Sequence, residues 1–202
     1  YYTKAEIDIR RDEIEKTLGC NTLYIGGGTP SVLPLSVLEA IVGRLGYGPY
    51  DEFTVEVNPE DVVDGGAEYA CGLVRMGVTR VSMGVQSLDD VVLRRMNRRH
   101  DAESARKAVS ILRGSGIENI SIDLIFGGLG VDMDKLESTL GGFVSLSPEH
   151  ISAYQLSVED GSALASMIAR GEYEELSDDE CRKQYELVCR SLAAAGYEVR
   201  KP

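Results

Sequence analysis

Five short runs rich in β-branched and other apolar residues recur along the chain and alternate with helical patterns. The runs cover residues 22–25, 53–57, 80–85, 119–126 and 150–156. Their starts are spaced by about 27 to 39 residues, which is the length of one strand-plus-helix unit. Strands that alternate with helices favour a parallel sheet with right-handed crossovers. The sequence therefore predicts an α/β fold.

Apolar residues at helical spacing fill the segments between several of these runs. We expect helices over residues 35–45, 101–113 and 135–144, and two more over 4–18 and 178–195. Ser36 and Glu39 have the spacing of a capping box at the start of the first of these. The segment 4–18 resembles a helix whose preceding strand is missing, and residues 197–200 could begin one more strand. No linker or second domain is visible, so residues 1–202 are interpreted as one partial domain.

Composition narrows the class of protein. The 202 residues carry a net charge of −12, which argues against nucleic acid or an anionic membrane as the main partner. No apolar run approaches the roughly 20 residues of a membrane span. The four cysteines have no metal-ligand spacing, and nothing else is typical of a secreted protein. We therefore predict reduced cysteines, a cytoplasmic location and no metal site within this chain.

A glycine-rich segment, Gly26 to Pro30, follows the first predicted strand. Ligands of parallel α/β proteins bind beyond the carboxyl ends of the strands, so this position is a candidate binding loop. Its N–H groups could bind a carboxylate or phosphate, and its carbonyls could receive an ammonium group. A simple turn is the alternative, because the P-loop and dinucleotide-binding patterns are both absent.

Polar side chains also occur at the ends of the other four strands. Each one alone is explained by a satisfied structural contact, but together they predict a ligand pocket lined by carboxylates, an amide and hydroxyls. Arg98 is either a solvated helix-end cation or the cation for a ligand carboxylate. The histidines, His100 and His150, are interpreted as surface or capping residues. The strand-end residues are Glu56, Gln86, Asp123 and Ser157.

This set of motifs, in order and spacing, resembles the oxygen-independent coproporphyrinogen III oxidase family of radical S-adenosylmethionine (SAM) proteins. The resemblance covers the chain from about Leu23 to Glu198. One loop departs from the family pattern, at residues 126–132. The motifs that carry the resemblance are Tyr24-Ile25-Gly26-Gly27-Gly28-Thr29-Pro30-Ser31, Glu56-Val57-Asn58-Pro59, Arg80-Val81-Ser82-Met83-Gly84-Val85-Gln86-Ser87, Ile122-Asp123-Leu124-Ile125-Phe126-Gly127 and His150-Ile151-Ser152-Ala153-Tyr154.

The resemblance implies a partial (β/α)6 TIM-like barrel of the radical SAM type that lacks its first strand. It also implies S-adenosyl-L-methionine as a cofactor and a [4Fe–4S] cluster in the intact protein. The family's C-x3-C-x2-C cluster motif is not present in this chain, so its ligands are expected elsewhere and the fragment alone is expected to be inactive. By the same resemblance, cofactor binding is assigned to Gly27, Gly28, Thr29, Glu56, Gln86, Arg98, Asp123 and Ser157.

Two functions occur in this family. One is an oxidoreductase of porphyrin biosynthesis, which oxidatively decarboxylates coproporphyrinogen III. The other is a haem-binding chaperone without oxidase activity, and the residues around Tyr24 and Ser152 resemble that branch. Either function implies a porphyrinogen or haem ligand and an electron donor as partners, with no nucleic acid and no stable membrane anchor. A barrel enzyme with a phosphate-binding glycine loop is a third interpretation, and the carboxylate-rich pocket disfavours it.

Overall fold

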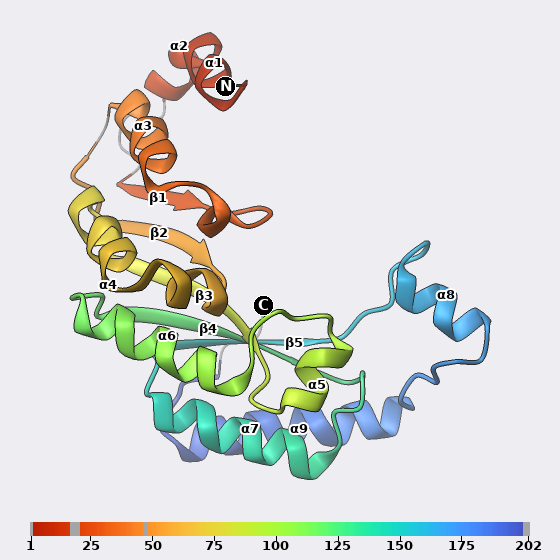
Figure 1. The fold of residues 1–202 in the computed structure, drawn as a ribbon. Helices are drawn as coiled ribbons and strands as arrows, with labels where there is room; N and C mark the ends of the chain where they lie inside the picture. The colour runs from red at the N-terminus through yellow and green to blue at the C-terminus, as the bar shows by residue number, and fades with distance from the viewer. Residues whose placement is uncertain (1, 17–20, 47, 200–202) are drawn as a thin grey trace. The chain divides into compact units, whose positions relative to one another are not determined.

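The computed structural model describes residues 2–16, 21–46 and 48–199, and it has the predicted alternation of strands and helices (Figure 1). Five strands form one sheet in the order β1-β2-β3-β4-β5. The pairs β1–β2 and β2–β3 are parallel. The predicted α/β class and partial barrel are confirmed. The strands are β1 (Thr22–Ile25), β2 (Glu52–Val57), β3 (Arg80–Gln86), β4 (Asn119–Phe126) and β5 (His150–Gln155).

Helices follow each of these strands. The segment predicted as one helix over 4–18 forms two short helices, and its residues 17–18 lie outside the described part. Residues 197–199 form no strand, and Arg200 is outside the described part. The helices are α1 (Tyr2–Ile9), α2 (Arg11–Glu15), η1 (Pro30–Val32), α3 (Leu35–Leu45), α4 (Pro59–Met76), α5 (Asp90–Arg95), α6 (Ala102–Gly114), α7 (Met133–Leu146), α8 (Ala163–Ala169) and α9 (Asp178–Ala194).

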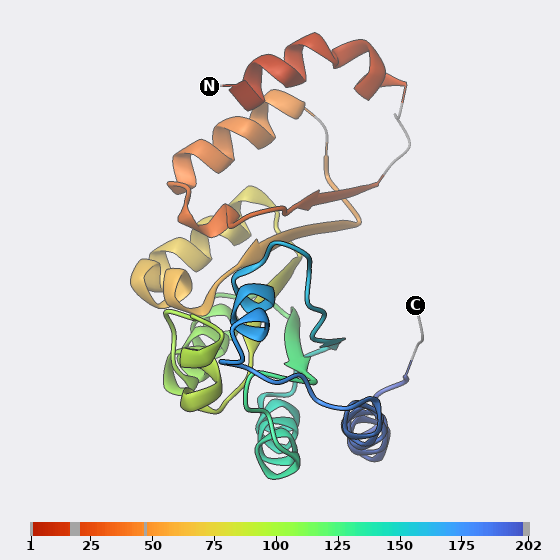
Figure 2. The same ribbon diagram turned by 90° about the vertical axis from the view of Figure 1, so that its right-hand side faces the viewer.

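The chain divides into two compact units. The first comprises Tyr1–Gly84 and Arg106–Ser121, and the second comprises Val85–Ala105 and Ile122–Pro202. In the first unit, α3 and α4 lie on the same side of β1 and β2 (Figures 1 and 2). Fully buried apolar side chains from Leu38 and Leu73 on those helices and from Phe53 on β2 form its core. Burial of this apolar surface is the main term that stabilises the unit.

The core of the second unit lies between strand β4 and helices α7 and α9. Leu124 and Phe126 on β4, Leu140 and Phe143 on α7, and Leu187 on α9 are all buried. Helices α7 and α9 run side by side (Figure 2). This packing fixes the loop that follows β4 against the start of α9.

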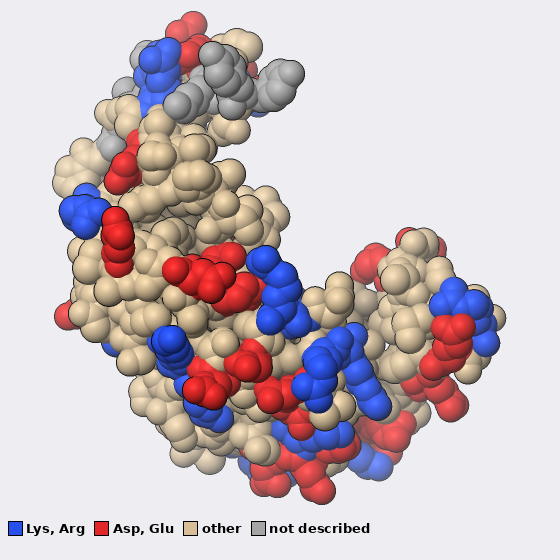
Figure 3. Space-filling view, in the orientation of Figure 1, with Lys and Arg blue, Asp and Glu red and all other residues tan. Residues whose placement is uncertain are grey.

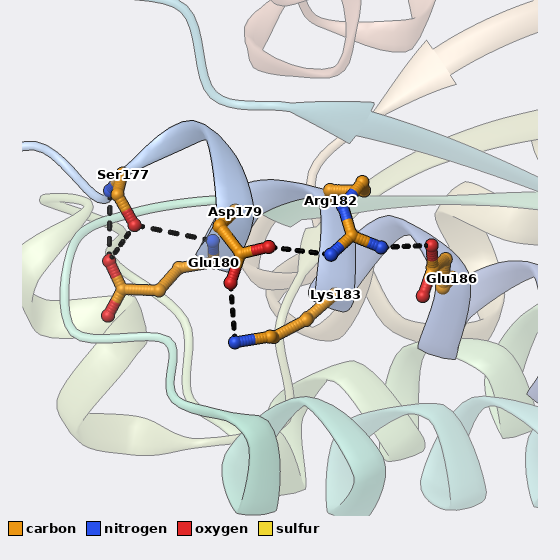
Figure 4. Close-up of polar contacts among 6 residues, drawn as sticks. All are labelled: Ser177, Asp179, Glu180, Arg182, Lys183 and Glu186. Atoms are coloured by element: carbon orange, nitrogen blue, oxygen red, sulfur yellow. Dashed lines mark hydrogen bonds and ion pairs between the residues drawn. The ribbon is translucent and has the colours of Figure 1, made fainter.

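A capping box begins α9 rather than α3. The Ser177 hydroxyl accepts from the Glu180 N–H, and the Glu180 carboxylate accepts from the Ser177 N–H (Figure 4). The capping box predicted at Ser36 is wrong, because the cap residue of α3 is Pro34 and it makes no side-chain cap. The extended backbone of Pro34 starts the helix at Leu35, which places Ser36 inside the first turn.

Figure 4 also shows the Ser177 hydroxyl donating to the Glu180 carboxylate, and a set of exposed ion pairs along α9. Asp179 pairs with Arg182 at 2.6 Å and with Lys183 at 2.5 Å, and Arg182 also pairs with Glu186 at 2.6 Å. On the face shown in Figure 3, basic side chains lie among acidic ones and do not gather in one patch. In the described part of the chain, no helix combines the length and apolar character needed to cross a membrane.

Candidate functional site

The glycine-rich loop leaves β1 beside the carboxylate of Glu56 on β2. The strand register pairs Tyr24 with Thr54 and Ile25 with Val55, so Glu56 lies level with the first residue after β1. The Tyr24 hydroxyl donates to Glu56 Oε1 at 2.6 Å, and the Gly27 N–H donates to Glu56 Oε2 at 3.0 Å. Both oxygens of the carboxylate are therefore fixed against the loop.

The three glycines of the loop serve different purposes. A Cβ on Gly26 would lie 2.5 Å from the Tyr24 ring and 2.7 Å from the Glu56 carboxylate, so any other residue would displace one of these two side chains. Gly27 and Gly28 have φ angles of +80° and +104°, which side chains disfavour, and no atom lies within 4 Å of a Cβ placed on either. Their outer surface is therefore open to a ligand.

The loop continues into η1 and is fastened to α4. Thr29 is half-buried and precedes η1, with no side-chain cap. The next side chain along, Ser31, donates to Asp61 Oδ2 at 2.6 Å and accepts from the Asn58 N–H at 3.1 Å. These bonds hold the far end of the loop in one place relative to Glu56 and β2.

Of the site residues in the second unit, Gln86 is the most constrained. It ends β3 with a φ of +66° and only 6% of its surface exposed. Its Oε1 is buried and has no hydrogen-bond partner among the described residues. Buried side-chain oxygens in proteins are rarely left without a donor. The amide is therefore available to a ligand.

Arg98, Asp123 and Ser157 lie on three separate elements of the same unit. Arg98 follows α5, is half-buried, and forms no ion pair with another described residue. Asp123 is half-buried on β4 between two buried apolar neighbours. Ser157 is exposed after β5 and donates to Glu159 Oε1 at 3.0 Å.

Sequence reasoning missed one contact in each unit. Tyr24 was not expected to bond Glu56, although the two-residue period of strands places Tyr24, opposite Thr54, on the same face as Glu56. His100 was interpreted as a surface or capping residue, yet it is 5% exposed and its Nε2 lies 3.0 Å from the Val85 carbonyl oxygen. Its place between Arg99 and Asp101 gives no signal for burial.

The residues present fit S-adenosylmethionine but not an iron–sulfur cluster. In the first unit, the open loop beside the Glu56 carboxylate suits a ligand that carries an ammonium group. In the second unit, the buried Gln86 amide oxygen has no hydrogen-bond partner among the described residues and suits a ligand donor. Cys71, Cys181 and Cys189 are free and do not cluster, while Cys20 lies outside the described residues. No group of three His, Cys, Asp or Glu in the described part is placed to hold a metal ion.

Comparison with known sequences and structures places this fold in a family. The family model "Radical SAM superfamily" matches residues 1–141. A haem chaperone (HemW) of Lactococcus lactis is 37% identical over 92% of this chain and 48% of its own length. One from Mycobacterium tuberculosis is 33% identical over 96% of this chain and 50% of its own length. The chain thus spans about half the length of these curated relatives.

Coproporphyrinogen III oxidases are also among the similar proteins, at lower sequence identity. An oxygen-independent coproporphyrinogen III oxidase of Paracoccus denitrificans is 26% identical over 74% of this chain and 34% of its own length. The solved structure of coproporphyrinogen III oxidase (HemN) from Escherichia coli superimposes with a TM-score of 0.74, at 22% identity, over 96% of this chain and 47% of that one. The resemblance derived from the motifs is confirmed, and the chain belongs to the radical SAM superfamily.

Proposed function

We propose that the full-length protein binds S-adenosylmethionine on this domain and works in porphyrin or haem metabolism. The observation that carries the proposal is the glycine loop beside Glu56. The Gly27 N–H already donates to that carboxylate, so it does not offer itself to an anion. A negative charge held beside the loop favours an ammonium group and disfavours phosphate. The aminoacyl end of S-adenosylmethionine has such a group.

The other proposed contacts supply the complementary chemistry. Gly27, Gly28 and Thr29 would receive the methionine part of the ligand, while the Arg98 guanidinium would bind its carboxylate. Carboxylates such as Glu56 and Asp123 accept from ammonium or ribose hydroxyls, and Gln86 and Ser157 add polar partners. Bound S-adenosylmethionine supplies, on reductive cleavage, the radical chemistry of the family. In this proposal the described residues would bind and orient the ligand, and no group of three His, Cys, Asp or Glu among them is placed to hold a metal ion.

Isothermal titration of the full-length protein with S-adenosylmethionine tests this proposal. Glu56→Ala and Asp123→Ala each remove a charged hydrogen-bonding partner, and each should weaken binding by about tenfold or more. Glu39→Ala on the exposed face of α3 is the control and should bind like wild type. Absence of binding by the wild type, or both site variants matching it, would contradict the proposal.

Between the two functions in the family, we favour the haem-binding chaperone. The relatives that are named haem chaperones are 32–37% identical, whereas the coproporphyrinogen oxidase relative is 26% identical. The test compares anaerobic turnover of coproporphyrinogen III with stoichiometric haem binding, both on full-length protein reconstituted with iron and sulfide. Haem binding without turnover supports the chaperone, and turnover supports the oxidase.

A further inference from the structure

Strand β3 ends in an unusually tight turn. The Ser87 N–H donates to the Val85 carbonyl oxygen at 2.8 Å, which closes a three-residue turn around Gln86. With φ at +66°, Gln86 has the rare, strained form of the γ-turn. Glycine would relieve this strain, but the position carries a long polar side chain. Such a conformation persists only where the surroundings impose it.

One of these surroundings is His100, which acts on the carbonyl that closes the turn. Its Nε2 lies 3.0 Å from the Val85 oxygen, and the ring is 5% exposed. A carbonyl oxygen has no proton to give, so Nε2 must be the donor in this bond. The Val85 oxygen therefore accepts from both Ser87 and His100, which fixes its direction and with it the turn.

The other side of the turn is held from α7. The Ser87 and Thr139 hydroxyl oxygens are 3.3 Å apart, and both residues are 3% exposed. The Ser87 oxygen also accepts from the Asp89 N–H at 3.1 Å. The turn is thus fastened on both sides, and the residue at its centre is the one whose buried amide oxygen has no partner in the described chain.

We propose that His100 is a positioning residue, which holds the strained turn so that the Gln86 amide meets a donor of the bound ligand. This rests on the proposed function, in which that ligand is S-adenosylmethionine. His100 does not itself touch the ligand. It acts through the Val85 carbonyl, and its contribution is visible only when Gln86 is present.

The test uses full-length protein with His100→Leu, which removes the donor, and His100→Gln, whose amide nitrogen replaces Nε2. Without ligand, amide hydrogen exchange at Ser87 should speed up in His100→Leu and stay near wild type in His100→Gln. With S-adenosylmethionine, His100→Leu should raise Kd by about tenfold and His100→Gln should recover most of the affinity. In a Gln86→Ala background, His100→Leu should have no further effect on Kd.

The exchange measurement needs no ligand, so it separates this inference from the proposed function. If the wild type fails to bind S-adenosylmethionine, the proposed function is refuted, but hydrogen exchange at Ser87 still tests whether His100 holds the turn. Unchanged exchange at Ser87 in His100→Leu would overturn the inference. An equal loss of affinity with and without the Gln86 side chain would also overturn it, since a general structural role acts that way. If His100→Leu does not fold, His100→Asn, too short to reach Val85, takes its place against His100→Gln.

Discussion

Replacing Gly26 by alanine tests whether the loop beside Glu56 depends on a missing side chain. The added Cβ would lie 2.5 Å from Tyr24 Cε1 and 2.7 Å from the Glu56 carboxylate. Carbon atoms pack best at about 3.5 Å or more, so the ring or the carboxylate must move by about 1 Å. The Tyr24–Glu56 hydrogen bond is 2.6 Å long. Lengthening it by that amount takes it out of hydrogen-bonding range.

The cost follows from the lost bond. A hydrogen bond to a charged group contributes about 1.5–3 kcal/mol. Tyr24 is 55% exposed, so water replaces part of it and the loss lies at the low end. Gly26→Ala should therefore lower the free energy of unfolding by about 1–2 kcal/mol. For a chain of this length the Tm should fall by about 2–8 °C, measured by urea and thermal denaturation.

Two further variants sharpen the result. Gly43→Ala lies in α3 with no atom within 4 Å of its Cβ, so it should stabilise the protein by about 0.5–1 kcal/mol. In a Tyr24→Phe background the hydrogen bond is already absent, so Gly26→Ala should cost less there. The reasoning fails if Gly26→Ala is as stable as wild type, or if its cost is undiminished beside Tyr24→Phe.

Three other substitutions are expected to change stability. Thr139→Val removes the buried hydroxyl beside Ser87 and should cost about 1–3 kcal/mol in denaturant unfolding, and no loss would refute that role. The buried Gln184 amide accepts from the Gly127 N–H at 2.8 Å and donates to the Val131 carbonyl oxygen at 2.7 Å, and Gln184→Leu leaves both backbone groups without this partner. The variant should therefore lose at least about 1 kcal/mol in the free energy of unfolding, and a smaller loss would contradict the structure. Tyr69 has a buried hydroxyl without a partner in the described chain, and burial, with the Asp61 charge, raises its pKa to about 12. Its unfolded phenol ionises first, so stability should fall as the pH rises from about 10 to 12, and Tyr69→Phe should abolish that fall and add about 1 kcal/mol.

The sheet could be predicted from sequence because its signal is local. Each strand is a short apolar run that ends in turn residues, and the predicted bounds of β1 and β4 match the structure exactly as 22–25 and 119–126. Glycine near a helix end is a local signal of the same kind, since Gly46 and Gly116 follow α3 and α6 and have positive φ angles of 73° and 98°. Helix starts were harder to predict, because Pro34 set the start of α3 ahead of the expected Ser36.

The residue types of the glycine loop do not by themselves determine which ligand the loop binds. The sequence alone allows two ligands: a phosphate bound by the N–H groups of the loop, or an ammonium group bound by its carbonyls. The choice depends on where Glu56 points, and that follows from the pairing of β1 with β2. Once the Gly27 N–H is bonded to the carboxylate, the local charge is negative and the phosphate alternative loses one of its donors. A contact between residues 29 positions apart therefore favours the ammonium alternative for this five-residue motif.

The turn at Gln86 is the feature that is hardest to predict from the sequence, and this difficulty is itself an argument for a functional role. Periodicity predicts regular elements, and a positive φ is predicted by glycine or asparagine, so a glutamine in that conformation leaves no signature. His100 and His150 look alike in sequence, yet only His100 is buried against the turn. Sequence rules fail where local preference is overruled by tertiary contacts, and such places are typically functional. The strained backbone, the partnerless amide oxygen and the buried histidine meet at one strand end, and this coincidence is the reason that we infer a ligand contact there.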